Sequence, residues 1–164
     1  MLTHVGERPE PDPVMVALHK RRMMFAWIPL AFAVLVLVIR LPMLPDVIPT
    51  HYGLDGAADG WGSKWWALIP TLIGPAILGV LRLLLAHPKI YNFPVEVTGT
   101  NAQHLYSASL TLIVRIAWGV SIIFAGITLL TAFPSATWLI GVVCLVALGV
   151  LLAIAAAFYT MTRS

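Results

Sequence analysis

Residues 23–41 read MMFAWIPLAFAVLVLVIRL, and this stretch decides the fold. It is apolar except for Arg40 near its end. A helix needs about 20 largely apolar residues to cross a bilayer, where the backbone must satisfy its own hydrogen bonds because water is absent. Residues 23–41 therefore predict a transmembrane helix.

Three more stretches of the same character follow, at residues 65–86, 110–133 and 137–159. Together with the first they predict an all-α integral membrane protein, with one four-helix transmembrane domain over residues 23–160. Two small-residue stripes at i, i+4, i+8 spacing suit helix packing in lipid, and we expect both to serve packing within the chain. The stripes are Ala117, Ser121 and Ala125 in the third span, and Gly149, Ala153 and Ala157 in the fourth.

The composition agrees with this class. Of the 164 residues, 60% are hydrophobic and only 10% are charged, whereas soluble domains have about 25% charged residues. This excludes an ordinary soluble enzyme, a disordered chain and a free nucleic-acid binder. The lipid bilayer is the expected partner and nucleic acid is not. The single cysteine excludes an internal disulfide, and we expect no cofactor.

Basic residues set the orientation, because Lys and Arg are enriched in cytoplasmic loops. With the N-terminus inside, eight of the ten basic residues face the cytoplasm and two face outward. The eight are Arg8, Lys20, Arg21, Arg22, Arg82, Lys89, Arg115 and Arg163; the two are Arg40 and Lys64. An even number of spans then places both termini in the cytoplasm.

Residues 1–22 precede the first span and end in the basic run at 20–22. The stretch ERPEPDP at residues 7–13 has three prolines and no apolar period, so we expect a disordered, basic cytoplasmic tail. A cleaved signal peptide is disfavoured because the A-x-A match at residues 31–33 lies inside the apolar run. We expect the first helix to be retained.

The loop at residues 42–64 is expected outside and is rich in proline and glycine, which exclude a continuous helix. Residues 47–52 have an extended pattern, and Asp55-Gly56 is a hairpin-turn signal. We predict a short irregular or β-hairpin element over the outer mouth of the bundle. Trp61 in this loop suits the membrane interface.

One histidine and several carboxylates share this loop: His51, Asp46, Asp55 and Asp59. They could hydrogen-bond the loop together, present a surface for a ligand, or bind zinc and activate a water. A single histidine is a sparse basis for a metal site, so the first interpretation is favoured over ligand binding, and ligand binding over catalysis. No metal site is expected.

The loop before the third span is expected inside. Thr100 and Gln103 have capping-box spacing, which predicts that a helix begins near Asn101. Arg82 and Arg115 lie near the predicted cytoplasmic ends of the second and third spans. We expect both to act as anchors at the membrane interface.

The two loops carry motifs that resemble one known family. The outer motif is Leu44-Pro45-Asp46-x-Ile48-Pro49-Thr50-His51-Tyr52, then Gly56-x-x-Asp59-x-Trp61-Gly62-Ser63-Lys64. The inner motif is Asn92-Phe93-Pro94-Val95 with Asn101-Ala102-Gln103 and Tyr106. Both are similar to the bacterial membrane family called domain of unknown function 1648 (DUF1648), which includes SdpI-like proteins.

Two sets of candidate site residues follow from these motifs. The outer set is Pro45, Asp46, Pro49, His51, Gly56, Asp59, Trp61, Gly62 and Lys64; the inner set is Asn92, Pro94, Glu96, Asn101, Gln103 and Tyr106.

The resemblance implies a small bacterial plasma-membrane protein with the outer motif facing outward. SdpI-like relatives protect the producing cell against a secreted antimicrobial peptide and relay its presence to a cytoplasmic repressor. We therefore expect a non-enzymatic sensing or immunity module with a protein or peptide partner. The alternatives are an accessory subunit of a membrane complex or transporter, and a membrane enzyme that uses His51 with Asp55 or Asp59. The sequence leaves the oligomeric state open.

Overall fold

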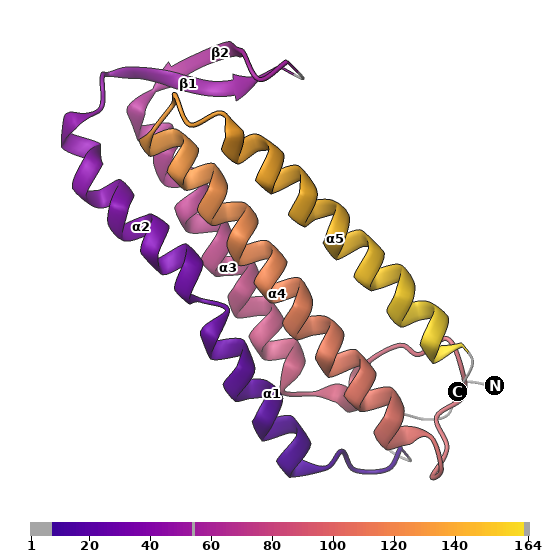
Figure 1. Cartoon of the computed structure of the whole chain (residues 1–164). Coiled ribbons are helices and arrows are strands. Elements are labelled where there is room, and N and C mark those ends of the chain that lie inside the picture. Colours follow the sequence, from indigo (N-terminus) through magenta and orange to yellow (C-terminus); the bar gives the residue numbers. More distant parts are fainter. Residues whose placement is uncertain (1–7, 54, 163–164) are drawn as a thin grey trace.

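A computed structural model of the chain describes residues 8–53 and 55–162. Long helices run side by side, and a two-stranded antiparallel hairpin lies across one end of them (Figure 1). The helices are α1 (Pro13–Phe25), α2 (Ile28–Arg40), α3 (Leu68–Leu85), α4 (Ala102–Ala132) and α5 (Trp138–Met161), and the strands are β1 (Val47–Tyr52) and β2 (Ala58–Ser63). Short 3₁₀ turns cover Leu41–Met43, Lys64–Ala67 and Pro88–Ile90.

Four helical segments of the described chain are long and apolar enough to cross a membrane. They are Pro13–Met43, Lys64–Leu85, Ala102–Ala132 and Trp138–Met161. Each overlaps one predicted span, so the prediction of an all-α, four-span membrane protein with a short β-hairpin between the first two spans is confirmed. The side of the membrane that the hairpin faces stays a prediction.

The prediction of a disordered tail over residues 1–22 is wrong from Pro13 onward, because α1 begins there. Asp12 caps this helix: its side chain accepts a hydrogen bond from the Val14 N–H at 2.8 Å. Proline at the first helical position has the φ angle that a helix needs and lacks only an N–H that would have no partner there. Residues 1–7 lie outside the described part of the chain.

The first span is broken into α1 and α2 by a turn at residues 26–27. Pro29 explains the break, since it lacks an N–H and its ring clashes with the carbonyl four residues earlier, at Phe25. The Leu30 N–H then donates to Ser121 Oγ of α4 at 3.2 Å. A side chain of the third span therefore satisfies a backbone group that the break leaves open.

α4 is the central helix and packs against α2, α3 and α5. Its small residues Ala117, Ser121 and Ala125 are all buried. The core beside them combines Leu30 of α2, Leu78 and Leu85 of α3, and Leu110 and Val114 of α4. The small stripe of the third span therefore allows close approach of the earlier helices.

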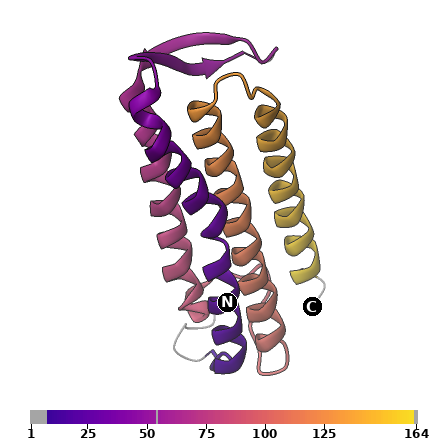
Figure 2. The same ribbon diagram turned by 60° about the vertical axis from the view of Figure 1, so that its left-hand side comes forward.

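α5 runs antiparallel to α4 on its other side (Figure 2). Valines of α5 fit against glycines of α4: an added Cβ at Gly126 would lie 2.7 Å from Val143 Cγ2, and one at Gly119 would overlap Val150 Cγ2. The predicted α5 stripe contributes less, since Gly149 faces open space. Large apolar side chains on the remaining faces of α5 are exposed, as expected for contact with lipid.

Candidate functional site

The hairpin is closed at its base by two residues of the outer motif. Lys64 Nζ lies 2.9 Å from Asp46 Oδ1, and the Lys64 N–H donates to the Asp46 carbonyl, also at 2.9 Å. At the other end Gly56 has a φ of +78°, a conformation that favours glycine. The Asp55 carboxylate accepts a hydrogen bond from the Ala57 N–H at 3.0 Å. The Asp-Gly turn prediction is confirmed.

Two glycines of β2 let other groups approach the strand closely. A Cβ at Gly60 would lie 2.9 Å from the Cβ of His51 on β1. One at Gly62 would lie 3.1 Å from Thr50 Cγ2 and 3.2 Å from Trp66 Cδ1. The strand register is irregular on both sides of His51, as in a β-bulge, which re-aims side chains. Glycine at position 62 therefore leaves room for the indole of Trp66, which a larger residue would displace slightly.

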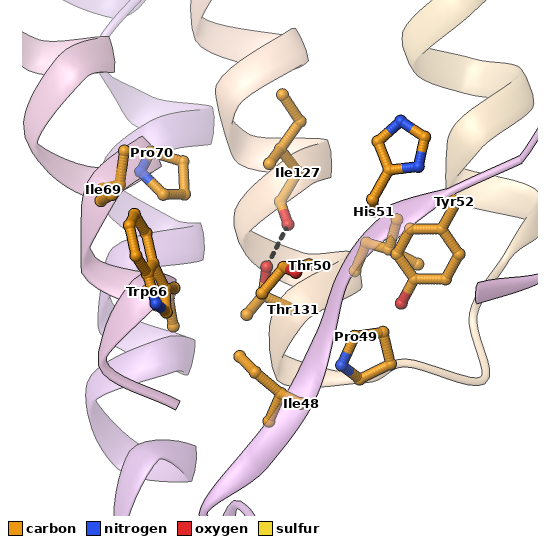
Figure 3. Close-up of a pocket in the computed structure, with 12 residues that line it drawn as sticks. Ile48, Pro49, Thr50, His51, Tyr52, Trp66, Ile69, Pro70, Ile127 and Thr131 are labelled. Carbon is orange, nitrogen blue, oxygen red and sulfur yellow. Dashed lines mark hydrogen bonds between the residues drawn. The ribbon is translucent and has the colours of Figure 1, made fainter. Parts of the chain in front are cut away.

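Beneath the hairpin is a cavity of about 350 Å³. Figure 3 shows its walls: β1 supplies Ile48 to Tyr52, the 3₁₀ turn Lys64–Ala67 supplies Trp66, the start of α3 supplies Ile69 and Pro70, and α4 supplies Ile127 and Thr131. The lining is mainly apolar. Cavities that bind small ligands have this size and character, with a few polar groups that set orientation.

One polar group of the lining lacks a hydrogen-bond partner among the described residues. The Tyr52 hydroxyl is buried and has no hydrogen-bond partner within the described residues, which costs free energy unless a ligand or water supplies one. Burial raises the pKa of Tyr52 above its usual value, so the hydroxyl stays protonated and can donate. Thr131, by contrast, already donates to the Ile127 carbonyl at 2.9 Å.

At the rim of the cavity, His51 Nδ1 contacts Asp59 Oδ1. Both side chains are more than half exposed, at 72% and 53%. Asp46 and Asp55 are bound elsewhere, so of the candidate carboxylates only Asp59 is joined to the histidine. Within residues 8–53 and 55–162 there is no group of three or more His, Cys, Asp and Glu side chains placed to hold a metal ion.

The outer motif therefore divides into two groups. Asp46, Gly56, Gly62 and Lys64 build the hairpin. The others lie at the cavity or the surface: Pro49 and His51 line the cavity, Asp59 holds His51, and Trp61 and Pro45 are exposed. Sequence reasoning missed Tyr52, Gly60 and Trp66 as parts of this site.

The inner motif lies at the opposite end of the molecule, in the α3–α4 loop (residues 86–101) and the first turns of α4. Asn101 ties the loop: its Oδ1 accepts from the Thr98 N–H at 2.8 Å, and its Nδ2 donates to the Glu96 carbonyl at 3.0 Å. Asn92 and Pro94 line a second cavity of about 380 Å³.

Gln103 and Tyr106 instead contact the segment at residues 8–12. The capping-box prediction is wrong, because Asn101 is the N-cap of α4 without a side-chain cap and Gln103 binds that segment.

The two predicted interface arginines occupy different settings. Arg82 is partly buried in the last turn of α3, and its Nη1 has no hydrogen-bond partner among the described residues. Arg115 is exposed beside shallow grooves between α4 and α5. Their role as membrane anchors stays a prediction.

The motif that builds the hairpin is also what links the chain to known proteins. Residues 28–74 match the family described as Domain of unknown function (DUF1648). This confirms the resemblance predicted from the outer motif. The DUF1648 match spans α2, the hairpin and the first part of α3, whereas the inner motif lies outside it. No curated protein and no solved structure matches the chain.

Proposed function

We propose that the chain is a non-enzymatic module of the bacterial plasma membrane whose hairpin cavity binds an extracytoplasmic apolar peptide, for sensing or immunity. In this proposal the hairpin faces outward and both termini are cytoplasmic, in line with the distribution of Lys and Arg. The SdpI-like resemblance supports a peptide as the ligand.

The observation that carries the proposal is the cavity with its buried, unpartnered Tyr52 hydroxyl. A volume of about 350 Å³ has room for one or two large apolar side chains. Tyr52 would then donate to a carbonyl of the peptide backbone. Trp61 and Trp65 are exposed beside the cavity, at 63% and 60%, and suit the membrane interface, where amphipathic peptides accumulate.

The exposed His51–Asp59 pair is the observation that the enzyme alternative would use. A histidine base acts on a nucleophile or a metal-bound water held within hydrogen-bond reach. Among the described residues, the only ion-pair partner of His51 is Asp59. We therefore assign the pair to ligand contact at the rim.

A substitution that fills the cavity with a larger side chain tests the proposal. Cells expressing the wild-type chain, Thr131→Trp or Thr137→Trp are challenged with a panel of cationic, Leu- and Trp-rich amphipathic peptides, and survival is measured with membrane abundance. Thr131 lines the cavity, whereas Thr137 is exposed in the α4–α5 connection and serves as the control.

We expect the wild type and Thr137→Trp to protect against at least one peptide, and Thr131→Trp to lose protection at equal abundance. Tyr52→Phe removes only the hydroxyl and should weaken binding of the same peptide by about tenfold. Equal protection by Thr131→Trp would refute the cavity as the site, and no protection against any peptide would refute the peptide ligand. Recovery of a stable larger complex by native mass spectrometry would instead favour the accessory-subunit alternative.

A further inference from the structure

We propose that the end of the molecule opposite the hairpin carries a binding surface for an extended arginine–proline–acidic peptide segment, occupied here by the chain's own residues 8–12. The surface, called the segment site below, consists of Lys89, Tyr91 and Phe93 in the α3–α4 loop and Gln103 and Tyr106 in α4. Residues 8–12 read RPEPD and lead into α1 (Figure 1). This inference is independent of the proposed function.

The segment site binds the arginine side chain in two ways, through hydrogen bonds to the charged guanidinium and through contact of its planar face with an aromatic ring. Arg8 Nη1 donates to the carbonyls of Lys89 and Tyr91, each at 2.7 Å. The guanidinium carbon lies 5.6 Å from the centroid of the Phe93 ring, which is a cation–π contact. Hydrogen bonds from a charged donor are about twice as strong as neutral ones. Lysine cannot make the same planar contact.

The segment site also forms hydrogen bonds with the backbone of residues 9–12. The Gln103 side chain donates from Nε2 to the Glu10 carbonyl at 2.6 Å and accepts from the Asp12 N–H at 2.9 Å. Tyr106 is fully buried, and its hydroxyl donates to the Pro9 carbonyl at 3.0 Å. A glutamine amide that pairs with both a C=O and an N–H holds an extended chain much as a neighbouring strand would.

Proline and an acidic residue complete the match. Prolines at positions 9 and 11 have no N–H to leave unpaired, and they favour the extended polyproline conformation before binding. Lys89 Nζ lies 2.7 Å from Glu10 Oε1. That ion pair is largely exposed on the glutamate side and adds selectivity more than affinity.

The start of α1 has a cap that does not come from residues 8–11. Asp12 caps α1 with its own side chain, so α1 can begin without residues 8–11. The segment contributes no large apolar side chain, and its contacts are hydrogen bonds and charge. Such a segment can leave and be replaced by a protein segment of the same chemistry, although a covalently attached segment competes at an effective concentration in the millimolar range.

The proposal is tested by measuring whether a free peptide binds to a chain whose own arginine has been removed. The probe is the dye-labelled peptide Arg-Pro-Glu-Pro-Asp-Pro, which carries residues 8–13, and its anisotropy is titrated with the full chain in nanodiscs. The Arg8→Ala chain has an open arginine position, so it should bind the peptide at least about tenfold more tightly than the wild-type chain does. Adding Gln103→Ala to that chain should remove the gain, whereas adding His104→Ala, an exposed neighbour, should not.

A second measurement follows the chain's own residues 8–12 in place of the free peptide. Hydrogen exchange of the Asp12 amide should be slow in the wild type and in His104→Ala, and faster in Gln103→Ala, with the same melting temperature in each. Three results would overturn the proposal: a peptide with alanine in place of arginine that binds equally well, an Arg8→Ala chain that binds no better than wild type, or fast Asp12 exchange in the wild type.

Discussion

Replacing Gly119 by alanine tests the contact that holds α5 against α4. The added methyl group would overlap Val150 Cγ2, whereas the same change at Gly126 places a methyl 2.7 Å from Val143 Cγ2. Carbon atoms in contact lie about 3.5–4.0 Å apart, so α5 must move outward by about 1 Å even for the milder change. A change of the Val150 rotamer would relieve the overlap only at an energetic cost, because a β-branched side chain in a helix has one strongly preferred rotamer.

The magnitude follows from the cost of overpacking, which is about 1–3 kcal/mol for an added methylene in a tight core. Alanine is also a better helix former than glycine, by about 1 kcal/mol in water. Gly149→Ala is the matched control, because its methyl meets no atom within 4 Å. Both variants share the propensity gain. We therefore expect Gly119→Ala to be about 1–3 kcal/mol less stable than Gly149→Ala, with Gly126→Ala between them.

Reversible unfolding of the purified chain in mixed micelles, followed by circular dichroism, measures these differences. A double variant with Val150→Ala should recover much of the loss, and the interaction energy from the double-mutant cycle should be favourable. If Gly119→Ala is as stable as Gly149→Ala, the valine–glycine contact does not hold α5 in place and the reasoning fails.

Three further predictions concern other parts of the structure. Ser121→Ala leaves the Leu30 N–H without its acceptor in the apolar core, so unfolding should show a loss of about 1–3 kcal/mol, and Ser121→Thr should lose less. Gly62→Ala should displace the indole of Trp66 by a few tenths of an ångström and shift its fluorescence, with no loss of helix content by circular dichroism. Burial raises the pKa of Tyr91 to about 12. The unfolded chain ionises this phenol first, so stability should fall as pH rises from about 10 to about 12, and absorbance titration should show a late phase that Tyr91→Phe removes.

The hairpin could be predicted because its signals are local. An Asp-Gly pair between two extended stretches specifies a turn, and Gly56 takes the positive φ that such a turn requires. The four spans were equally accessible, because crossing lipid is a matter of length and hydropathy within one stretch. The pairing of Asp46 with Lys64 follows once the turn is fixed.

Long-range contacts explain what the sequence did not show. The cavity needs Thr131 of α4 opposite Tyr52 of β1, and no local pattern relates two residues so far apart. The composition of the proline-rich N-terminal stretch predicts disorder. Its order comes from Gln103 and Tyr106, which lie more than ninety positions along the chain. The pair Asp12-Pro13 by itself favours a helix start, because aspartate is a good N-cap and proline suits the first helical position.

The central place of α4 means that the boundary of the DUF1648 match is not a folding boundary. The match ends at residue 74, yet the floor of the cavity and the acceptor for the Leu30 N–H both come from α4, which begins at residue 102. Without α4 the matched stretch would have a Leu30 N–H that lacks its Ser121 acceptor and a cavity that lacks the wall formed by Ile127 and Thr131. A fragment cut at residue 74 would therefore keep the outer motif and lose the residues of α4 that complete the cavity.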